Sequence, residues 1–209
     1  MAPRQTRERI LETSLAMFNA QGEPNVTTNH IADELEISPG NLYYHFRNKD
    51  DIIEHLFGRY EERIDAALAA PSGRLPGLED VWLQLHLVFE CIWDYRFLYR
   101  DLANILSRNR RLRIRFARIL RRADEQAHTV MRGLSQAGVM RASAAELDAA
   151  ATNVLVIATF WLNYASARGD KDEQVSIRAG IVQVMMLLAP FLRDAERVHL
   201  NTLTRAYID

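Results

Sequence analysis

Apolar residues recur along this chain at helical spacing, and polar residues fill the positions between them. Within residues 6–20, for example, Leu11, Leu15 and Phe18 follow an i, i+4, i+7 pattern, which places them on one helix face. No segment alternates apolar and polar residues between turn signals, as a half-buried strand would. The pattern therefore predicts an all-α fold of about nine to ten helices.

The same periodicity and its stop signals define the other expected helices. They are predicted at residues 28–35, 39–45, 48–68, 78–94, 98–106, 110–136, 143–167, 172–188 and 194–207. The helix at 78–94 is apolar on nearly all sides, which predicts that it is buried on all sides. Pro190 is expected to kink or end the helix at 172–188, because proline cannot continue the backbone hydrogen bonds.

Two short helices near the N-terminus are separated by a three-residue turn, residues 36–38. Ser38 is suited to cap the second helix, and Pro39 suits its first position, where the missing N–H costs nothing. Leu42 and Phe46 lie one turn apart and face inward, which leaves the aromatic and amide side chains between them facing outward. This arrangement is typical of a helix-turn-helix, whose second helix enters the DNA major groove.

Residues 26–57, VTTNHIADELEISPGNLYYHFRNKDDIIEHLF, closely resemble the DNA-binding motif of TetR/AcrR-family transcriptional regulators. The resemblance covers roughly the first quarter of the chain and includes the whole helix-turn-helix. It implies a three-helix head followed by a larger C-terminal helical domain for ligand binding and dimerisation. Glu36 departs from the family pattern, which often has glycine there. If this turn residue is left-handed, a side chain costs about 1 kcal/mol.

A Pro/Gly-rich segment at residues 70–77 is the clearest break in the chain. We therefore expect a DNA-binding domain at residues 1–50, with the first half of a connecting helix at 49–69 attached to it. Residues 70–209 are expected to form the effector-binding and dimerisation domain.

The resemblance also implies which residues contact DNA. Tyr43, His45 and Lys49 resemble a phosphate clamp, since all three side chains can donate to phosphate oxygens. Asn29 and Asn41 are the expected base readers, because an amide can bond bidentately to adenine. The full predicted set is Thr27, Thr28, Asn29, Ser38, Pro39, Gly40, Asn41, Tyr43, Tyr44, His45 and Lys49.

Charge gives no support for DNA binding. The 209-residue chain has a net charge of −1, and residues 1–50 contain five Arg/Lys against seven Asp/Glu. Phosphate contacts would therefore depend on hydroxyls, backbone N–H groups and helix N-termini. The acidic head also leaves an alternative open, in which an all-α ligand-binding or interaction protein has a helix-turn-helix that no longer binds DNA.

Eight arginines lie between Ser107 and Arg122. The simplest interpretation is a solvated face of the helix at 110–136. The alternatives are a site for an acidic effector, such as an acyl-coenzyme A or a carboxylate, and an electrostatic bias toward DNA.

The C-terminal region is expected to hold an effector pocket and a dimer interface. Its aromatic and methionine residues suggest an apolar or aromatic small molecule. The candidate pocket residues are Trp82, Phe89, Trp93, Phe97, Tyr99, Met131, Trp161 and Tyr164. Two late apolar helices exceed what one core needs, which favours a four-helix homodimer interface. Its candidate residues are Leu155, Leu162, Ile181, Met185 and Leu188.

Other functional classes lack a signal in the sequence. No HExxH, GxSxG or Walker motif is present, so we expect neither an enzyme nor a cofactor. Asp51 and His55 are spaced to share a metal but have no third ligand, so no metal site is expected. The start shows no signal peptide, the apolar runs are shorter than a membrane span, and Cys91 is the single cysteine. These features predict a cytoplasmic protein without a membrane partner.

Taken with the resemblance, these observations predict a homodimeric, effector-responsive repressor of transcription. Its two heads would bind double-stranded DNA at a palindromic operator, with recognition helices roughly 34 Å apart or slightly more.

Overall fold

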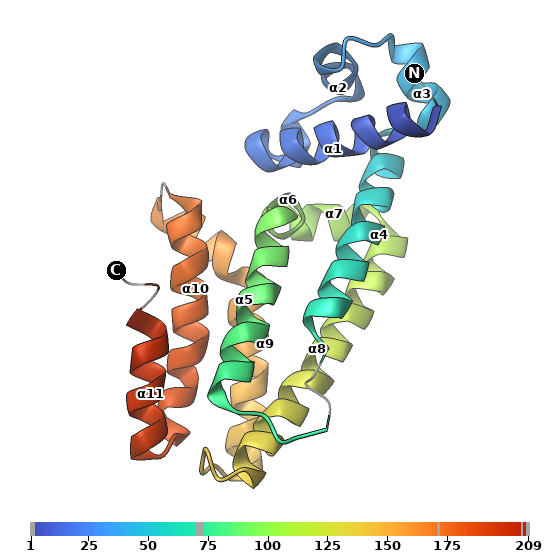
Figure 1. The fold of residues 1–209 in the computed structure, drawn as a ribbon. Helices are drawn as coiled ribbons and strands as arrows, with labels where there is room; N and C mark the ends of the chain where they lie inside the picture. Colours follow the sequence, from blue (N-terminus) through green and yellow to red (C-terminus); the bar gives the residue numbers. More distant parts are fainter. Residues whose placement is uncertain (1–2, 70–72, 171, 206, 208–209) are drawn as a thin grey trace. The chain divides into compact units, whose positions relative to one another are not determined.

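The computed structural model describes residues 3–69, 73–170, 172–205 and 207, so residues 70–72 of the expected break lie outside it. The described part contains eleven α-helices, more than the nine to ten expected, and no strand (Figure 1). They are α1 Pro3–Gln21, α2 Thr28–Glu34, α3 Pro39–His45, α4 Lys49–Ala67, α5 Leu78–Asp94, α6 Arg96–Arg100, α7 Leu102–Arg108, α8 Arg110–Gln136, α9 Ala144–Arg168, α10 Glu173–Leu188 and α11 Asp194–Arg205. The all-α prediction is confirmed.

The chain forms two compact units. The first comprises Met1–Arg63 with Asp94–Phe116, and the second comprises Ile64–Trp93 with Ala117–Asp209. The unit that contains the head thus extends beyond the expected residues 1–50, and the division falls within α4 and α8. The assignment of DNA binding to residues 1–50 and of effector binding to 70–209 stays a prediction.

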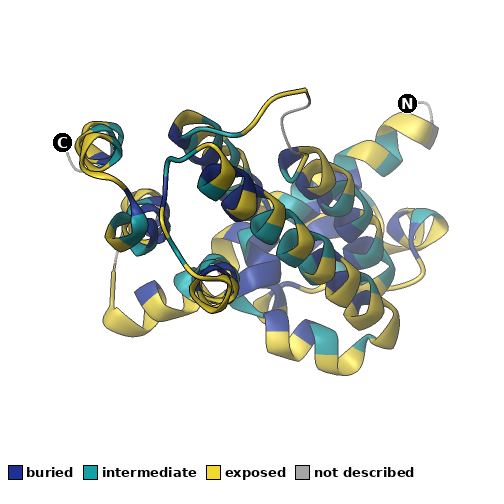
Figure 2. Ribbon diagram, turned by 90° about the horizontal axis from the view of Figure 1, so that it is seen from below, coloured by how far each residue is buried: buried dark blue, intermediate teal, exposed yellow. Residues whose placement is uncertain are grey.

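The helices bury one side and expose the other (Figure 2). Phe18 of α1 packs against Phe97 of α6, with ring centroids 5.3 Å apart. Tyr60 of α4 is fully buried, and its hydroxyl lies 2.7 Å from the hydroxyl of Tyr99 in α6. Each buried phenol therefore has a polar partner, so the aromatic core incurs no unsatisfied hydroxyl at this point.

The helix expected at residues 98–106 is in fact two helices, α6 and α7. The backbone leaves helical geometry at Asp101, whose φ and ψ are −105° and 18°. The carboxylate of Asp101 accepts a hydrogen bond from the backbone N–H of Glu23, at 3.2 Å. The break between the two helices thus places this carboxylate against the loop that precedes α2.

In the second unit, α10 packs along α9, and α11 lies beside α10 (Figure 1). Ser143 and Glu146 form a reciprocal capping box at the start of α9, and Gly169 ends the helix in the left-handed conformation, with φ 81°. Pro190 follows the end of α10 as expected.

The prediction that the helix at 78–94 is buried on all sides is wrong. Leu83 and Leu87 of α5 are exposed within the protomer, whereas Leu85, Phe89 and Ile92 are buried. Because α5 is apolar on nearly all sides, its sequence did not show that one side faces the core and the other is exposed.

A methyl group at Gly180 is expected to destabilise the protein. An ideal Cβ there would lie 2.6 Å from Phe89 Cε1 and 2.7 Å from Trp161 Cδ1, closer than real Cβ contacts. The overpacking cost of about 1–3 kcal/mol opposes the gain of about 1 kcal/mol from alanine in a helix. We expect Gly180→Ala to lower the free energy of unfolding by up to about 2 kcal/mol in urea titrations.

Gly58→Ala is the matched control, because Gly58 lies in α4 and an ideal Cβ there meets only Arg115 Nη2, at 3.7 Å. This variant is expected to be as stable as the wild type or more stable by up to about 1 kcal/mol. Equal effects of the two substitutions would refute the close packing around Gly180.

Candidate nucleic-acid interface

Side-chain caps define both helices of the helix-turn-helix. Thr27 Oγ1 accepts from the backbone N–H of His30 at 3.2 Å, and His30 Nδ1 accepts from the backbone N–H of Thr27 at 3.4 Å. At α3, Ser38 Oγ accepts from the backbone N–H of Asn41 at 3.2 Å, and Pro39 occupies the first turn. These local bonds stabilise two helices that are each only seven residues long.

The turn between the two helices contains the one described non-glycine residue with positive φ. Glu36 has φ 54°, which confirms that this position is left-handed. The backbone therefore bears a cost of about 1 kcal/mol that glycine would avoid. The turn nevertheless forms, with the backbone N–H of Ile37 bonded to the carbonyl of Ala32 at 3.0 Å.

Helix α3 buries one side chain and exposes its aromatic residues. Leu42 is fully buried, whereas Tyr43 and Tyr44 are 49% and 78% exposed. Core packing therefore does not explain the two tyrosines. The other predicted contact residues that are exposed are Thr27, Asn29, Ser38, Pro39, Gly40 and Asn41, while Thr28, His45 and Lys49 are half-buried.

Gly40 lies in the open on this surface. An ideal Cβ would meet nothing nearer than Ser38 Oγ, at 3.9 Å. Packing within the described chain therefore does not require glycine here, and its bare backbone suits the close approach of a partner.

Two contacts organise the polar groups next to α3. The hydroxyls of Thr28 and Tyr43 lie 3.0 Å apart and link the start of α2 to α3. The rings of Tyr44 and His45 meet edge to face, with centroids 5.0 Å apart. The structure thus places the hydroxyls of two predicted DNA-contact residues, Thr28 and Tyr43, next to each other.

Lys49 is oriented differently from the phosphate-contacting role that the resemblance implies. Its ammonium donates to the backbone carbonyls of Glu23 and Val26, each at 3.0 Å, and lies 2.8 Å from Glu23 Oε1. Sequence reasoning missed Glu23, because an acid in a loop gives no local sign that it will be buried.

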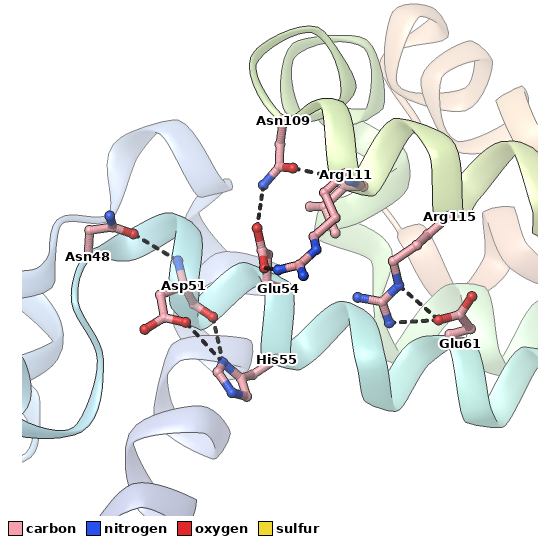
Figure 3. Close-up of polar contacts among 9 residues, drawn as sticks. Asn48, Asp51, Glu54, His55, Glu61, Asn109, Arg111 and Arg115 are labelled. Carbon is pink, nitrogen blue, oxygen red and sulfur yellow. Dashed lines mark hydrogen bonds and ion pairs between the residues drawn. The ribbon is translucent and has the colours of Figure 1, made fainter.

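A polar groove of about 1230 Å³ runs along α4 beside the end of α3. It is lined by both acidic and basic side chains, and Figure 3 shows their pairing. Arg111 Nη1 lies 3.2 Å from Glu54 Oε2, and Arg115 Nη2 lies 2.6 Å from Glu61 Oε2. Asn109 donates to Glu54 Oε1 at 3.2 Å.

The arginine run is both solvated and paired, since the arginines at positions 108, 110, 111, 113, 118 and 121 are exposed, as expected of a solvated face. Arg108, Arg111 and Arg115 bind acids of the head and α4 within the first unit. In the second unit, Arg122 pairs with Asp65 at 2.6 Å. Half of the run therefore connects α8 and the end of α7 to neighbouring elements, which reduces the charge available for an acidic effector.

The Asp51–His55 pair is a local contact. His55 Nδ1 donates to the carbonyl of Asp51 at 2.8 Å, and the Asp51 carboxylate lies 3.4 Å away (Figure 3). Among the described residues, no group of three or more His, Cys, Asp or Glu side chains could hold a metal ion.

The candidate effector residues lie in different surroundings. Phe97 and Tyr99 belong to the core of the first unit, and Tyr164 is exposed on α9, so none of the three is placed in an interior cavity of the second unit. Phe89 is fully buried, and Trp161 donates to the carbonyl of Ser176. The remaining candidates, Trp82, Trp93 and Met131, are half-buried or buried in the second unit, and their role stays a prediction.

Most of the predicted dimer residues face the interior of the protomer. Leu162, Ile181, Met185 and Leu188 are buried within the protomer, and Leu155 is half-buried. The exposed apolar side chains of α9 and α10 are instead Val156, Phe160, Tyr164, Val175 and Met186. Both sides of α9 are apolar, so the hydrophobic pattern could not show which side faces inward.

Two protein-family models match this chain. The model described as bacterial regulatory proteins of the tetR family matches residues 10–56, and the TetR model described as bacterial transcriptional repressor matches residues 59–200. Together they include the helix-turn-helix and most of the remaining helices.

Individual proteins agree with these matches. The solved structure of a TetR-family transcriptional regulator from Marinobacter aquaeolei VT8 is 38% identical, with a TM-score of 0.88 over 97% of this chain and 98% of that one. The transcriptional repressor KstR2 of Mycolicibacterium smegmatis is 34% identical over 84 residues, which is 36% of this chain and 40% of the relative. The match thus spans less than half of that relative's length.

A more distant structure has the same fold. SmeT, the repressor of the Stenotrophomonas maltophilia multidrug efflux pump SmeDEF, has been solved in complex with triclosan. That complex is 21% identical to this chain, with a TM-score of 0.62 over 92% of this chain and 94% of the other.

Proposed function

This chain belongs to the TetR family of bacterial transcriptional regulators, and we propose that it is a homodimeric repressor that binds a palindromic operator and releases it on binding a small molecule. The observation that carries the proposal is the outer side of α3. There, Asn41, Tyr43 and Tyr44 are exposed around the buried Leu42, on a helix too short to be stable alone.

Neutral groups would make most of the DNA contacts. The hydroxyls of Thr28 and Tyr43 are already 3.0 Å apart, and together with His45 they can donate to phosphate oxygens. Asn29 and Asn41 are exposed and can read base edges. The N-terminus of α2 lies beside these hydroxyls, and the dipole of a helix N-terminus favours an anion.

The exposed apolar face of α9 and α10 supports a homodimer. Val156, Phe160 and Tyr164 follow an i, i+4, i+8 pattern along α9, and each is more than half exposed. With Met186 of α10 they form a surface that a second copy would cover, which gives a four-helix interface. A groove of about 410 Å³ lies on this face, lined by residues of both helices.

By length and composition α9 could also cross a membrane, with 22% of its apolar window buried inside the protomer. A protein partner fits it better, because α9 packs along α10 and carries Glu146 and Arg168 in its end turns. We place the repressor in the cytoplasm, where its DNA lies.

The effector would bind in the second unit. SmeT binds triclosan, an aromatic molecule, on the same fold. The buried or half-buried Trp82, Trp93, Met131 and Trp161 give this chain a region suited to an apolar or aromatic ligand. The coupling between effector and operator would equal the effector's difference in affinity for the two states, typically about 1–3 kcal/mol.

Footprinting on the DNA upstream of the coding sequence tests the proposal. We expect protection of an inverted repeat whose half-sites are centred roughly one helical turn apart or slightly more. Absence of a protected site there and elsewhere in the genome would rule out the regulator.

Two substitutions in α3 should separate the two kinds of contact. Tyr43→Phe is expected to lower the affinity for all DNA duplexes by about tenfold, because it removes one hydroxyl donor to phosphate. Asn41→Ala is expected to relax the preference at one base step by roughly 1–3 kcal/mol. Binding should be measured on the protected duplex and on its single-base variants. Uniform weakening by Asn41→Ala would contradict its base-reading role.

A further inference from the structure

Glu23 is a fully buried acid in the loop between α1 and α2. Its side chain is 0% exposed, although it lies in a short 3-10 turn, Glu23–Asn25, at the surface of the first unit. Two cations approach its Oε1: Lys49 Nζ at 2.8 Å and Arg108 Nη2 at 2.7 Å. The loop, the first residue of α4 and the last residue of α7 therefore meet at one carboxylate.

The ammonium of Lys49 is held inside the head at this point. It donates to the carbonyls of Glu23 and Val26, each at 3.0 Å, and forms an ion pair with the Glu23 carboxylate, at 2.8 Å. A contact between Lys49 and a DNA phosphate would compete with this ion pair.

The carboxylate is ionised in the folded protein. Burial raises the pKa of Glu23, but the contacts with Arg108 and Lys49 outweigh burial and hold that pKa below its usual value. Burial and the nearby Glu23 charge raise the pKa of Asp101, which accepts from the Glu23 backbone N–H. Arg108 also lies 3.3 Å from Asp50, so this arginine contacts two carboxylates.

The position of the two carbonyls shows what this cluster controls. Val26 directly precedes Thr27 and Thr28, the cap and first residue of α2, and Glu23 begins the short turn before Val26. Thr28 is in turn bonded to Tyr43 of α3. Fixing these carbonyls to the start of α4 therefore fixes the hydroxyls expected to bind phosphate.

We propose that Glu23 is a positioning residue for DNA binding, and that it holds Lys49 inside the head so that Lys49 orders the start of α2 instead of contacting phosphate. This inference rests on the proposed DNA-binding function. It assigns an indirect role to the lysine that the family resemblance places in the phosphate clamp.

The salt dependence of operator binding tests the inference, because each direct phosphate contact contributes about 0.9 to the slope of log affinity against log salt. Glu23→Gln, Lys49→Met and the double variant should be compared with the wild type, on the operator and on an unrelated duplex. Each single variant is expected to lose roughly tenfold or more in operator affinity, with the slope unchanged. The double variant should be no worse than the weaker single variant, since both changes release the same loop.

Two controls separate positioning from stability and from bulk charge. Thermal unfolding tests whether each variant is folded at the assay temperature. The ratio of operator affinity to unrelated-duplex affinity should fall in both single variants, and loss of folded protein alone would not lower this ratio. Glu34→Gln removes an exposed acid of α2 and changes the net charge by the same amount as Glu23→Gln. It should leave the operator-to-unrelated affinity ratio unaltered.

A slope reduced by about 0.9 in Lys49→Met, with full operator affinity in Glu23→Gln, would show a direct phosphate contact and overturn the inference. If the wild type itself selects no duplex, the proposed function fails and this inference fails with it. If the wild type binds but the two variants act independently, the inference alone fails.

Discussion

Substitution of Phe160 by glutamate is expected to separate the proposed homodimer and to abolish binding to the proposed operator at concentrations that saturate the wild type. Phe160 is 54% exposed at the centre of the apolar face of α9. A two-fold interface would bury two unpaired carboxylates, each costing roughly 3–5 kcal/mol. A single head has too few contacts to hold a half-site tightly. Loss of the dimer should therefore lower the affinity for DNA.

Sedimentation equilibrium measures the first effect, and operator titration measures the second. Ile114→Glu is the matched control, because Ile114 is an apolar residue with similar exposure, 50%, on α8 in the first unit. This control should remain dimeric. A Phe160→Glu variant that stays dimeric would place the interface on another surface.

Removal of both cations at Glu23 is expected to reverse the acid dependence of stability. In the wild type, the pKa of Glu23 is lowered on folding, so its contribution is present above the unfolded pKa and is lost as pH falls through the folded pKa. In Lys49→Met/Arg108→Met the carboxylate stays buried without a partner, so its folded pKa should rise. The variant should then be less stable by about 3–5 kcal/mol at neutral pH and recover as acid protonates the carboxylate.

Urea titrations between neutral and mildly acidic pH measure this difference. Arg111→Met is the comparison, because the Arg111–Glu54 pair is exposed at the arginine and should contribute at most about 1 kcal/mol. If the double variant loses no more free energy of unfolding than Arg111→Met and keeps the wild-type pH profile, water or another group must solvate Glu23.

The helix-turn-helix could be predicted because its signals are local. Ser38 caps α3 through an N–H three residues away, and Leu42 lies one turn from Phe46. Asn48 likewise caps α4 by accepting from the backbone N–H of Asp51, at 2.9 Å. Each of these bonds joins residues close in sequence, so composition and spacing were sufficient.

The remaining features depend on distant pairing. Arg111 and Glu54 are separated by 57 residues, so nothing near either residue distinguishes a salt bridge from a solvated charge. Glu23 lies next to a proline in an otherwise polar loop, and its partners Lys49 and Arg108 are distant from it in sequence. The wrong dimer residues have a similar cause, because Leu162 and Phe160 lie on opposite sides of a helix that is apolar on both.

Selection from a library of random-sequence duplexes by the full-length protein tests the central claim most directly. The account predicts enrichment of an inverted repeat with half-sites roughly 10 base pairs apart or slightly more, bound with two copies per duplex and weakened by salt. If no sequence is enriched, or if the amount of bound DNA does not change with salt, the claim that the protein binds an operator is contradicted.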